Sequence, residues 1–129
     1  MTMPTAHFGT AITCIDGRVY EPVVKWLKEH FRLEYVDLIT MPGPDDALVR
    51  GLVEQITQVK TGAEISVRQH GSTVIGVVGH HNCSANPVSK EVHEQQIRQA
   101  VEVVRRWRLR AEVIGLWVNE RWEVEVVAK

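Results

Sequence analysis

The chain has 129 residues, of which 44% are hydrophobic and 24% are charged, and its formal net charge is −1 at pH 7. A chain of this length buries roughly two-thirds of its unfolded surface around one core, so we expect residues 1–129 to form a single domain. The near-neutral charge gives no general attraction to nucleic acid or to a membrane surface, and no apolar run approaches the roughly 18 residues of a membrane span.

The N-terminus and the cysteine content indicate a cellular compartment. Met1 to Phe8 lacks the charged and apolar regions of a signal peptide, so we expect a cytoplasmic protein. The sequence contains only two cysteines, Cys14 and Cys83, beside six histidines. Because disulfides are unusual in a reducing compartment, metal binding or simple burial explains these cysteines better.

The first half of the chain alternates between strand and helix patterns. FGTAITCI (8–15) predicts a first strand, and apolar residues spaced three and four apart over 20–31 predict a helix. EYVDLIT (34–40) predicts a second strand. After the Pro-Gly-Pro break we expect Asp45 or Asp46 to cap a helix. Its apolar positions are Leu48, Leu52, Ile56 and Val59, and a second short helix is expected around 63–70.

The second half predicts a buried strand, a long helix and a hairpin. STVIGVVGH (72–80) is typical of a central parallel strand covered on both faces. A long helix ending near Trp107 follows the loop HNCSANP, and EVIGLWV and RWEVEVV predict a terminal antiparallel hairpin with Trp117 and Trp122 facing one another. The order predicts an α/β fold, with a mainly parallel open sheet of about four parallel strands, flanking helices and a C-terminal antiparallel edge strand.

Residues with metal-binding side chains follow two of these expected parallel strands. Cys14 ends the first strand, His80 ends the third, and Cys83 follows three residues later. The carboxyl ends of parallel strands share one rim of a sheet, where ligands bind. Two thiolates and one imidazole suit Zn²⁺, and three protein ligands leave a place for a water whose pKa zinc lowers from about 15.7 to about 7. We therefore expect one catalytic zinc per chain.

A carboxylate and a guanidinium lie next to this expected site. Asp16 could accept a hydrogen bond from the zinc-bound water or complete the coordination as a fourth ligand. Arg18 offers a planar fork that can keep the Asp16 carboxylate ionised and limit its reach towards the metal. Viewed alone, the two residues would more often be a turn carboxylate and a surface ion pair of little energetic worth.

Other residues have simpler explanations. The pattern H-x-x-C is weak by itself, because free cysteine is commonly buried; Cys14 at a matching strand end makes metal binding the better interpretation. His81 could replace His80 as a ligand or shuttle protons, or do neither. The basic run RRWRLR (105–110) is better explained by cations at a helix C-terminus than by nucleic-acid binding.

With these residues assembled, the sequence resembles the β-class carbonic anhydrases. CIDGR resembles that family's Cys-x-Asp-Ser-Arg signature, and VVGHHNC resembles its strand followed by Gly-His-x-x-Cys. AEISVRQHGSTVIGVVGH resembles the family's helix leading into the third strand, and ITMPGPDD sits where the family has a loop after strand two. The resemblance covers about residues 8 to 118.

The resemblance implies a role for each matching residue. Cys14, His80 and Cys83 would bind zinc, and Asp16 and Arg18 would form the catalytic dyad. Zinc-bound hydroxide would attack CO2, and water would then displace bicarbonate. Family members are typically dimers or multiples of dimers, so we expect a homodimer or higher homo-oligomer, with a small-molecule substrate and neither nucleic acid nor membrane as a partner.

The sequence also departs from the family pattern, and other activities compete with this one. Gly17 stands where serine is usual, Ser84 follows the second cysteine where glycine is usual, and MPGP replaces an Arg-Asn-Ala-Gly type of loop. Because the sequence begins almost at the first strand, the resemblance leads us to expect a compact member without the family's N-terminal helices and the glutamine they contribute. The alternatives are a carbonyl sulfide or carbon disulfide hydrolase with the same zinc site, and a non-catalytic zinc-stabilised interaction module.

Overall fold

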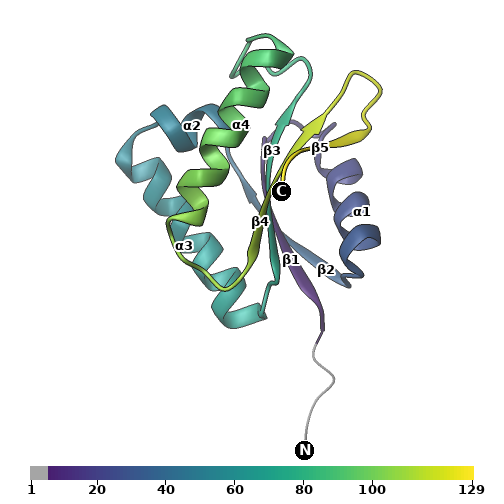
Figure 1. Ribbon diagram of the computed structural model, residues 1–129, viewed down its shortest axis with the longest axis vertical. Helices are drawn as coiled ribbons and strands as arrows, with labels where there is room; N and C mark the ends of the chain where they lie inside the picture. The colour runs from purple at the N-terminus through teal and green to yellow at the C-terminus, as the bar shows by residue number, and fades with distance from the viewer. Residues whose placement is uncertain (1–5) are drawn as a thin grey trace, which may run out of the picture.

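The computed structural model describes residues 6–129 as a five-stranded sheet with helices on both faces (Figure 1). Residues 1–5, part of the segment in which no signal peptide is predicted, lie outside the described residues. The elements in chain order are β1 (Phe8–Thr13), α1 (Tyr20–Phe31), β2 (Tyr35–Thr40), α2 (Pro44–Arg50), α3 (Val53–His70), β3 (Val74–His80), α4 (Lys90–Arg105), β4 (Glu112–Val118) and β5 (Val124–Ala128).

The strand order is β2-β1-β3-β4-β5, and it confirms the predicted α/β architecture. β1 pairs in parallel with β2 and with β3, and β3 pairs in parallel with β4. β5 returns antiparallel to β4 at the edge of the sheet. The chain therefore extends the sheet from β1 in one direction through β2 and in the other through β3, so the order reverses between β1 and β3.

The helices divide into two layers around this sheet. In Figure 1 α1 lies on one face, while α2, α3 and α4 cover the other. β3 is buried along its whole length, and its side chains alternate between the two cores: Ile75 and Val77 pack with the α2–α4 layer, Val74 and Val78 with the α1 layer. This burial on both faces explains why β3 reads as a continuous apolar run. Within residues 6–129, the helices are too short or too polar to cross a membrane.

The region after β2 differs from the sequence prediction. The sequence predicts one continuous helix that includes Leu48, Leu52, Ile56 and Val59, and a second short helix around 63–70. In the structure α2 ends at Arg50, and α3 is a single long helix that includes Ile56, Val59 and 63–70. Gly51 adopts an extended backbone, and the Leu52 N–H donates to Gln55 Oε1 at 3.0 Å to begin α3. The predicted caps are also wrong, because Gly43 is the N-cap of α2 and Pro44 begins the helix.

The two hairpin tryptophans do not face one another. Trp117 packs in the core on the α2–α4 side, whereas Trp122 packs against the core on the α1 side. Trp117 pairs across the hairpin with Glu125. Trp122 lies in the turn before β5, where its backbone φ is +59°, so strand alternation does not determine the side of the sheet that its ring covers.

Candidate metal centre

The site lies at the carboxyl ends of β1 and β3, the two neighbouring strands between which the strand order reverses. Cys14 directly follows β1, His80 is the last residue of β3, and Cys83 lies in the loop after it. In an open parallel sheet the loops at such a point diverge to opposite faces and leave a crevice between them. The topology therefore brings together the residues that the sequence placed on one rim.

Three buried side chains meet in this crevice. One ligand atom from each of Cys14, His80 and Cys83 lies within 4.8 Å of the other two. His80 Nδ1 donates to the carbonyl oxygen of His81 at 2.8 Å, which fixes the ring and makes Nε2 the unprotonated nitrogen of the neutral imidazole. Nε2 is buried and has no hydrogen-bond partner among residues 6–129. An unpaired buried acceptor beside two sulfurs is an arrangement that a cation would satisfy.

The electrostatics of the two thiols also favour a cation. Burial opposes ionisation of Cys14, but the His80 ring and the backbone N–H groups of Gly43 and Asp16 outweigh it and lower the pKa to about 7. Burial, followed by the neighbouring Cys14 sulfur, raises the pKa of Cys83 to about 11. Burial alone would lower the pKa of His80, yet contact with Cys14 raises it. Two thiols this close to each other can both be ionised only beside a positive charge.

Asp16 lies beside this cluster and is held by Arg18. Arg18 Nη2 donates to Asp16 Oδ2 at 2.7 Å, and Arg18 Nε donates to Oδ1 at 3.0 Å, so the guanidinium grips both carboxylate oxygens. The backbone N–H of Arg18 also donates to Oδ1 at 3.0 Å. The Arg18 side chain is the main cause that holds the pKa of Asp16 at about 2. The carboxylate is therefore ionised and remains an acceptor only.

Two residues that sequence reasoning missed contact Arg18. Asn82 Oδ1 accepts from Nη2 at 3.3 Å and from Nη1 at 3.4 Å, and the Asn82 carbonyl oxygen accepts from Nη2 at 3.3 Å. The guanidinium carbon lies 4.6 Å from the centroid of the Trp122 ring. His81 is exposed and its ring lies 6.4 Å from that of Trp122, outside the buried cluster. The sequence carries no local signal for these contacts, because both partners approach from distant loops.

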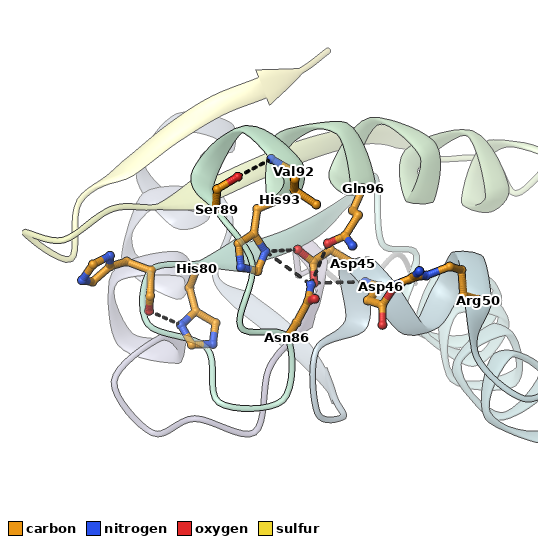
Figure 2. A network of polar contacts seen from close by, with 10 residues as sticks. Asp45, Asp46, Arg50, His80, Asn86, Ser89, Val92, His93 and Gln96 are labelled. Carbon is orange, nitrogen blue, oxygen red and sulfur yellow. Dashed lines mark hydrogen bonds and ion pairs between the residues drawn. The ribbon is translucent and has the colours of Figure 1, made fainter.

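A second polar network lies behind the cluster on the α2–α4 side (Figure 2). Asp45 Oδ2 lies 2.6 Å from His93 Nδ1, and both residues are almost completely buried, at 1% and 2% exposure. Asn86, in the loop after Cys83, donates to Asp45 Oδ1 at 3.2 Å and to Gln96 Oε1 at 2.7 Å. The network ties α2 and α4 to the loop that carries Cys83. The sequence analysis gave Asp45 only a capping role and missed its pairing with His93.

A small cavity opens beside the cluster. Its volume is about 240 Å³, and Cys14, Ile15, Asp16, Pro42, Ser84 and Ala85 line it. Three of these residues, Ile15, Pro42 and Ala85, are apolar, and Asp16 contributes the charged group. A larger hollow of about 900 Å³ lies between α1 and the outer edge of β2, away from the cluster. The smaller cavity borders the candidate metal centre through Cys14 and Asp16.

Known structures with the same arrangement identify the class of fold. The chain superposes on β-carbonic anhydrase isoform I of Trichomonas vaginalis with a TM-score of 0.62 and 15% identity, covering 100% of this chain and 87% of the relative. It superposes on a carbonic anhydrase of Streptococcus mutans with a TM-score of 0.62 and 17% identity, covering 98% of this chain and 86% of the relative. It superposes on a tetrameric β-carbonic anhydrase of Sordaria macrospora with a TM-score of 0.60 and 14% identity, covering 95% of this chain and 80% of the relative. The chain therefore has the β-carbonic anhydrase fold.

The sequence itself places the chain in a family. Residues 4–128 match the family described as "Putative carbonic anhydrase", and the chain belongs to that family. No match was found among curated proteins. The resemblance that the CIDGR and GHHNC motifs indicate is therefore confirmed for the family and for the fold.

Proposed function

We propose that the protein is a zinc-dependent carbonic anhydrase, which catalyses the reversible hydration of CO2 to bicarbonate. The observation that carries this proposal is the buried, unpaired His80 Nε2 within a cluster of two cysteines, next to an ionised Asp16. Family membership and fold support the same activity. We assign the metal to Cys14, His80 and Cys83, with one zinc per chain.

The donor set fits zinc by its chemistry. Thiolate and imidazole are the ligands that Zn²⁺ prefers, and the close approach of the three ligand atoms matches a single ion. When bound, zinc would lower the pKa of a coordinated water from about 15.7 to about 7. Three protein ligands leave the fourth position open to that water, which distinguishes a catalytic from a structural site.

The residues of this chain would orient the reacting water and surround the substrate with apolar walls, and none of them would form a covalent bond to the substrate. Asp16 would accept a hydrogen bond from the reacting water, which fixes the direction of the water's lone pairs, since an ionised carboxylate cannot donate. Arg18 would hold Asp16 ionised and keep the carboxylate from turning towards the metal. The apolar walls formed by Ile15, Pro42 and Ala85 suit a small linear molecule without a dipole, such as CO2.

The proposal predicts a specific effect for each of two adjacent histidines. His80→Ala should lose zinc and reduce CO2 hydration to the uncatalysed rate, because one of three ligands is gone. His81→Ala, the matched control, should keep zinc and most of the activity, because the His81 side chain is exposed and outside the cluster. Zinc is quantified by mass spectrometry, and hydration is followed by stopped flow in the same samples. Full activity in zinc-free, folded protein would contradict the proposal.

Carbonyl sulfide and carbon disulfide are the alternative substrates, because they are linear molecules that the same apolar cavity could admit. Release of hydrogen sulfide from these compounds, compared with CO2 turnover by the same preparation, separates the two activities. A zinc-stabilised interaction module without catalysis is the remaining alternative. It predicts bound zinc with hydration at the uncatalysed rate at every pH.

We also propose that residues 1–129 form one zinc domain that assembles into a homodimer or higher oligomer. The outer edge of β2 has no neighbouring strand within residues 6–129, and Tyr35 and Leu38 on it are 54% and 43% exposed. The S. macrospora relative is described as tetrameric. Light scattering should give at least twice the chain mass, and Leu38→Lys should lower it. A cytoplasmic location stays a prediction.

A further inference from the structure

Arg18 is held by more than the carboxylate it pairs with. Its guanidinium lies between Asp16, the Asn82 oxygens and the face of the Trp122 ring. These partners come from three separate segments: the turn after β1, the loop after β3 and the β4–β5 turn. Long arginine side chains on a surface usually sample many rotamers, and the Arg18 side chain is 48% exposed. Contacts from three segments restrict the Arg18 side chain to one rotamer.

The β4–β5 turn has an unusual backbone that places Trp122 on Arg18. Trp122 adopts a φ of +59°, a region that is unfavourable for a bulky residue and persists only where surrounding contacts enforce it. Asn119 provides those contacts: its carbonyl oxygen accepts from the Trp122 N–H at 2.9 Å, and its Oδ1 accepts from the N–H groups of Arg121 and Glu123 at 2.9 Å and 3.0 Å. The turn is thus fixed on both sides of the tryptophan.

The ring itself is anchored in the molecule. Trp122 packs against the core that includes Val19, Val23 and Leu27, beneath α1. Asn82, the other partner of Arg18, also has a left-handed backbone, with φ of +59°, which directs its carbonyl and its side chain to the same guanidinium. A cation over the face of tryptophan is attracted by the ring, and that contact also limits where the cation can move.

We propose that Trp122, together with Asn82, is a positioning residue that keeps the Arg18 fork on Asp16. Without the ring, Arg18 keeps its charge but gains rotamers, and the Asp16 carboxylate loses its fixed orientation. The geometric part of this inference concerns the chain alone. Its kinetic consequence rests on the proposed function, because only there does the orientation of Asp16 affect a reaction.

The central experiment measures Arg18 directly in metal-free protein. Hydrogen exchange of the Arg18 Nε–H, followed by NMR, reports how long its bond to Asp16 Oδ1 stays closed. Trp122→Leu should speed this exchange roughly two- to fivefold, the range expected for loss of a partly exposed cation–aromatic contact. Trp122→Phe, which keeps an aromatic face, should restore most of the protection. Asn82→Gly, which keeps the left-handed backbone but removes Oδ1, should speed exchange to a smaller extent.

Trp26→Leu is the matched control. Trp26 packs against the same core as Trp122, but its ring stacks on His30, with centroids 3.9 Å apart. Its replacement should lower the free energy of unfolding to a similar extent and leave the Arg18 exchange unchanged. In the zinc-loaded protein, Trp122→Leu should reduce kcat for CO2 hydration roughly two- to fivefold with little change in KM.

The outcomes separate this inference from the proposed function. If Trp122→Leu and Trp26→Leu have the same effect on Arg18 exchange, Trp122 only packs and the inference is overturned. If Arg18 exchange responds as expected but no variant or wild-type sample hydrates CO2, the positioning role stands and the proposed activity fails. If Trp122→Leu does not fold, Asn82→Gly still tests the proposal, because unchanged Arg18 exchange in that variant contradicts it.

Discussion

Two carboxylates flank the candidate metal centre, and their surroundings differ. Asp45 and His93 are 1% and 2% exposed, and Asn86 and Gln96 complete their hydrogen bonds. Asp16 and Arg18 are 21% and 48% exposed. A buried pair cannot exchange its partner for water, whereas an exposed pair can do so at little cost. The comparison indicates that the Asp45 side fixes the loops around the site, whereas the Asp16 side remains accessible to water.

The largest expected effect is on stability at the buried side. Asp45→Ala removes the buried acceptor of His93 and one of the two acceptors of Asn86, and it should lower the free energy of unfolding by about 3–5 kcal/mol. The matched control is Asp46→Ala in the same helical turn, whose exposed pair with Arg50 should contribute less than about 1 kcal/mol. Urea denaturation measures both. Equal effects of the two substitutions would contradict the distinction between the two sides.

The second effect is on activity at the exposed side. Asp16→Asn keeps the size of the side chain but removes the ionised acceptor, so kcat/KM for CO2 hydration should fall about 100-fold, the lower end of the cost of removing one preorganised polar group from an active site. The unfolding free energy should change by less than about 1 kcal/mol, because the pair with Arg18 is exposed. Asp46→Asn serves as the control. Activity that survives Asp16→Asn would remove Asp16 from the proposed reaction.

Substitutions at two glycines compare how tightly the Asp45 side and the Asp16 side are packed. A Cβ at Gly79 would lie 2.6 Å from Asp45 Oδ2 and 2.9 Å from Ile97 Cδ1, so Gly79→Ala should destabilise by about 1–3 kcal/mol. A Cβ at Gly17 meets nothing within 4 Å, and Gly17→Ser should change stability by less than about 0.5 kcal/mol. Thermal unfolding of the two variants decides. A large loss in Gly17→Ser would mean that the turn after β1 is tightly constrained.

The smallest expected effect is the change in stability as acid protonates the Asp16 carboxylate. Arg18 holds the pKa of Asp16 at about 2, below the ordinary value of about 3.9. A lowered carboxyl pKa adds stability that is present above about pH 4 and is lost as the pH falls through about 2. Exposure to solvent should keep that contribution well under about 1 kcal/mol. In metal-free Arg18→Gln, the NMR titration of the Asp16 carboxyl should return towards about 3.9; an unchanged midpoint would contradict the assignment.

Some features of the fold could be predicted because their signal is local. The unbroken apolar run of β3 and the alternation of strand and helix patterns were enough to predict a parallel sheet, and the sheet order confirms it. The break between α2 and α3 was missed, because Leu48, Leu52, Ile56 and Val59 keep helical spacing across it. Gly51 interrupts the backbone there without interrupting the hydrophobic pattern.

The sequence by itself determined that Cys14 and His80 would share a rim, because each ends a strand and parallel strands end at the same edge. It also determined the Asp16–Arg18 contact, which spans two residues. Only the tertiary structure decided that Asp45 would pair with His93 and that Trp122 would cover Arg18. These partners are separated by 48 and 104 positions, so their contacts depend on how loops cross the rim, which no local periodicity encodes.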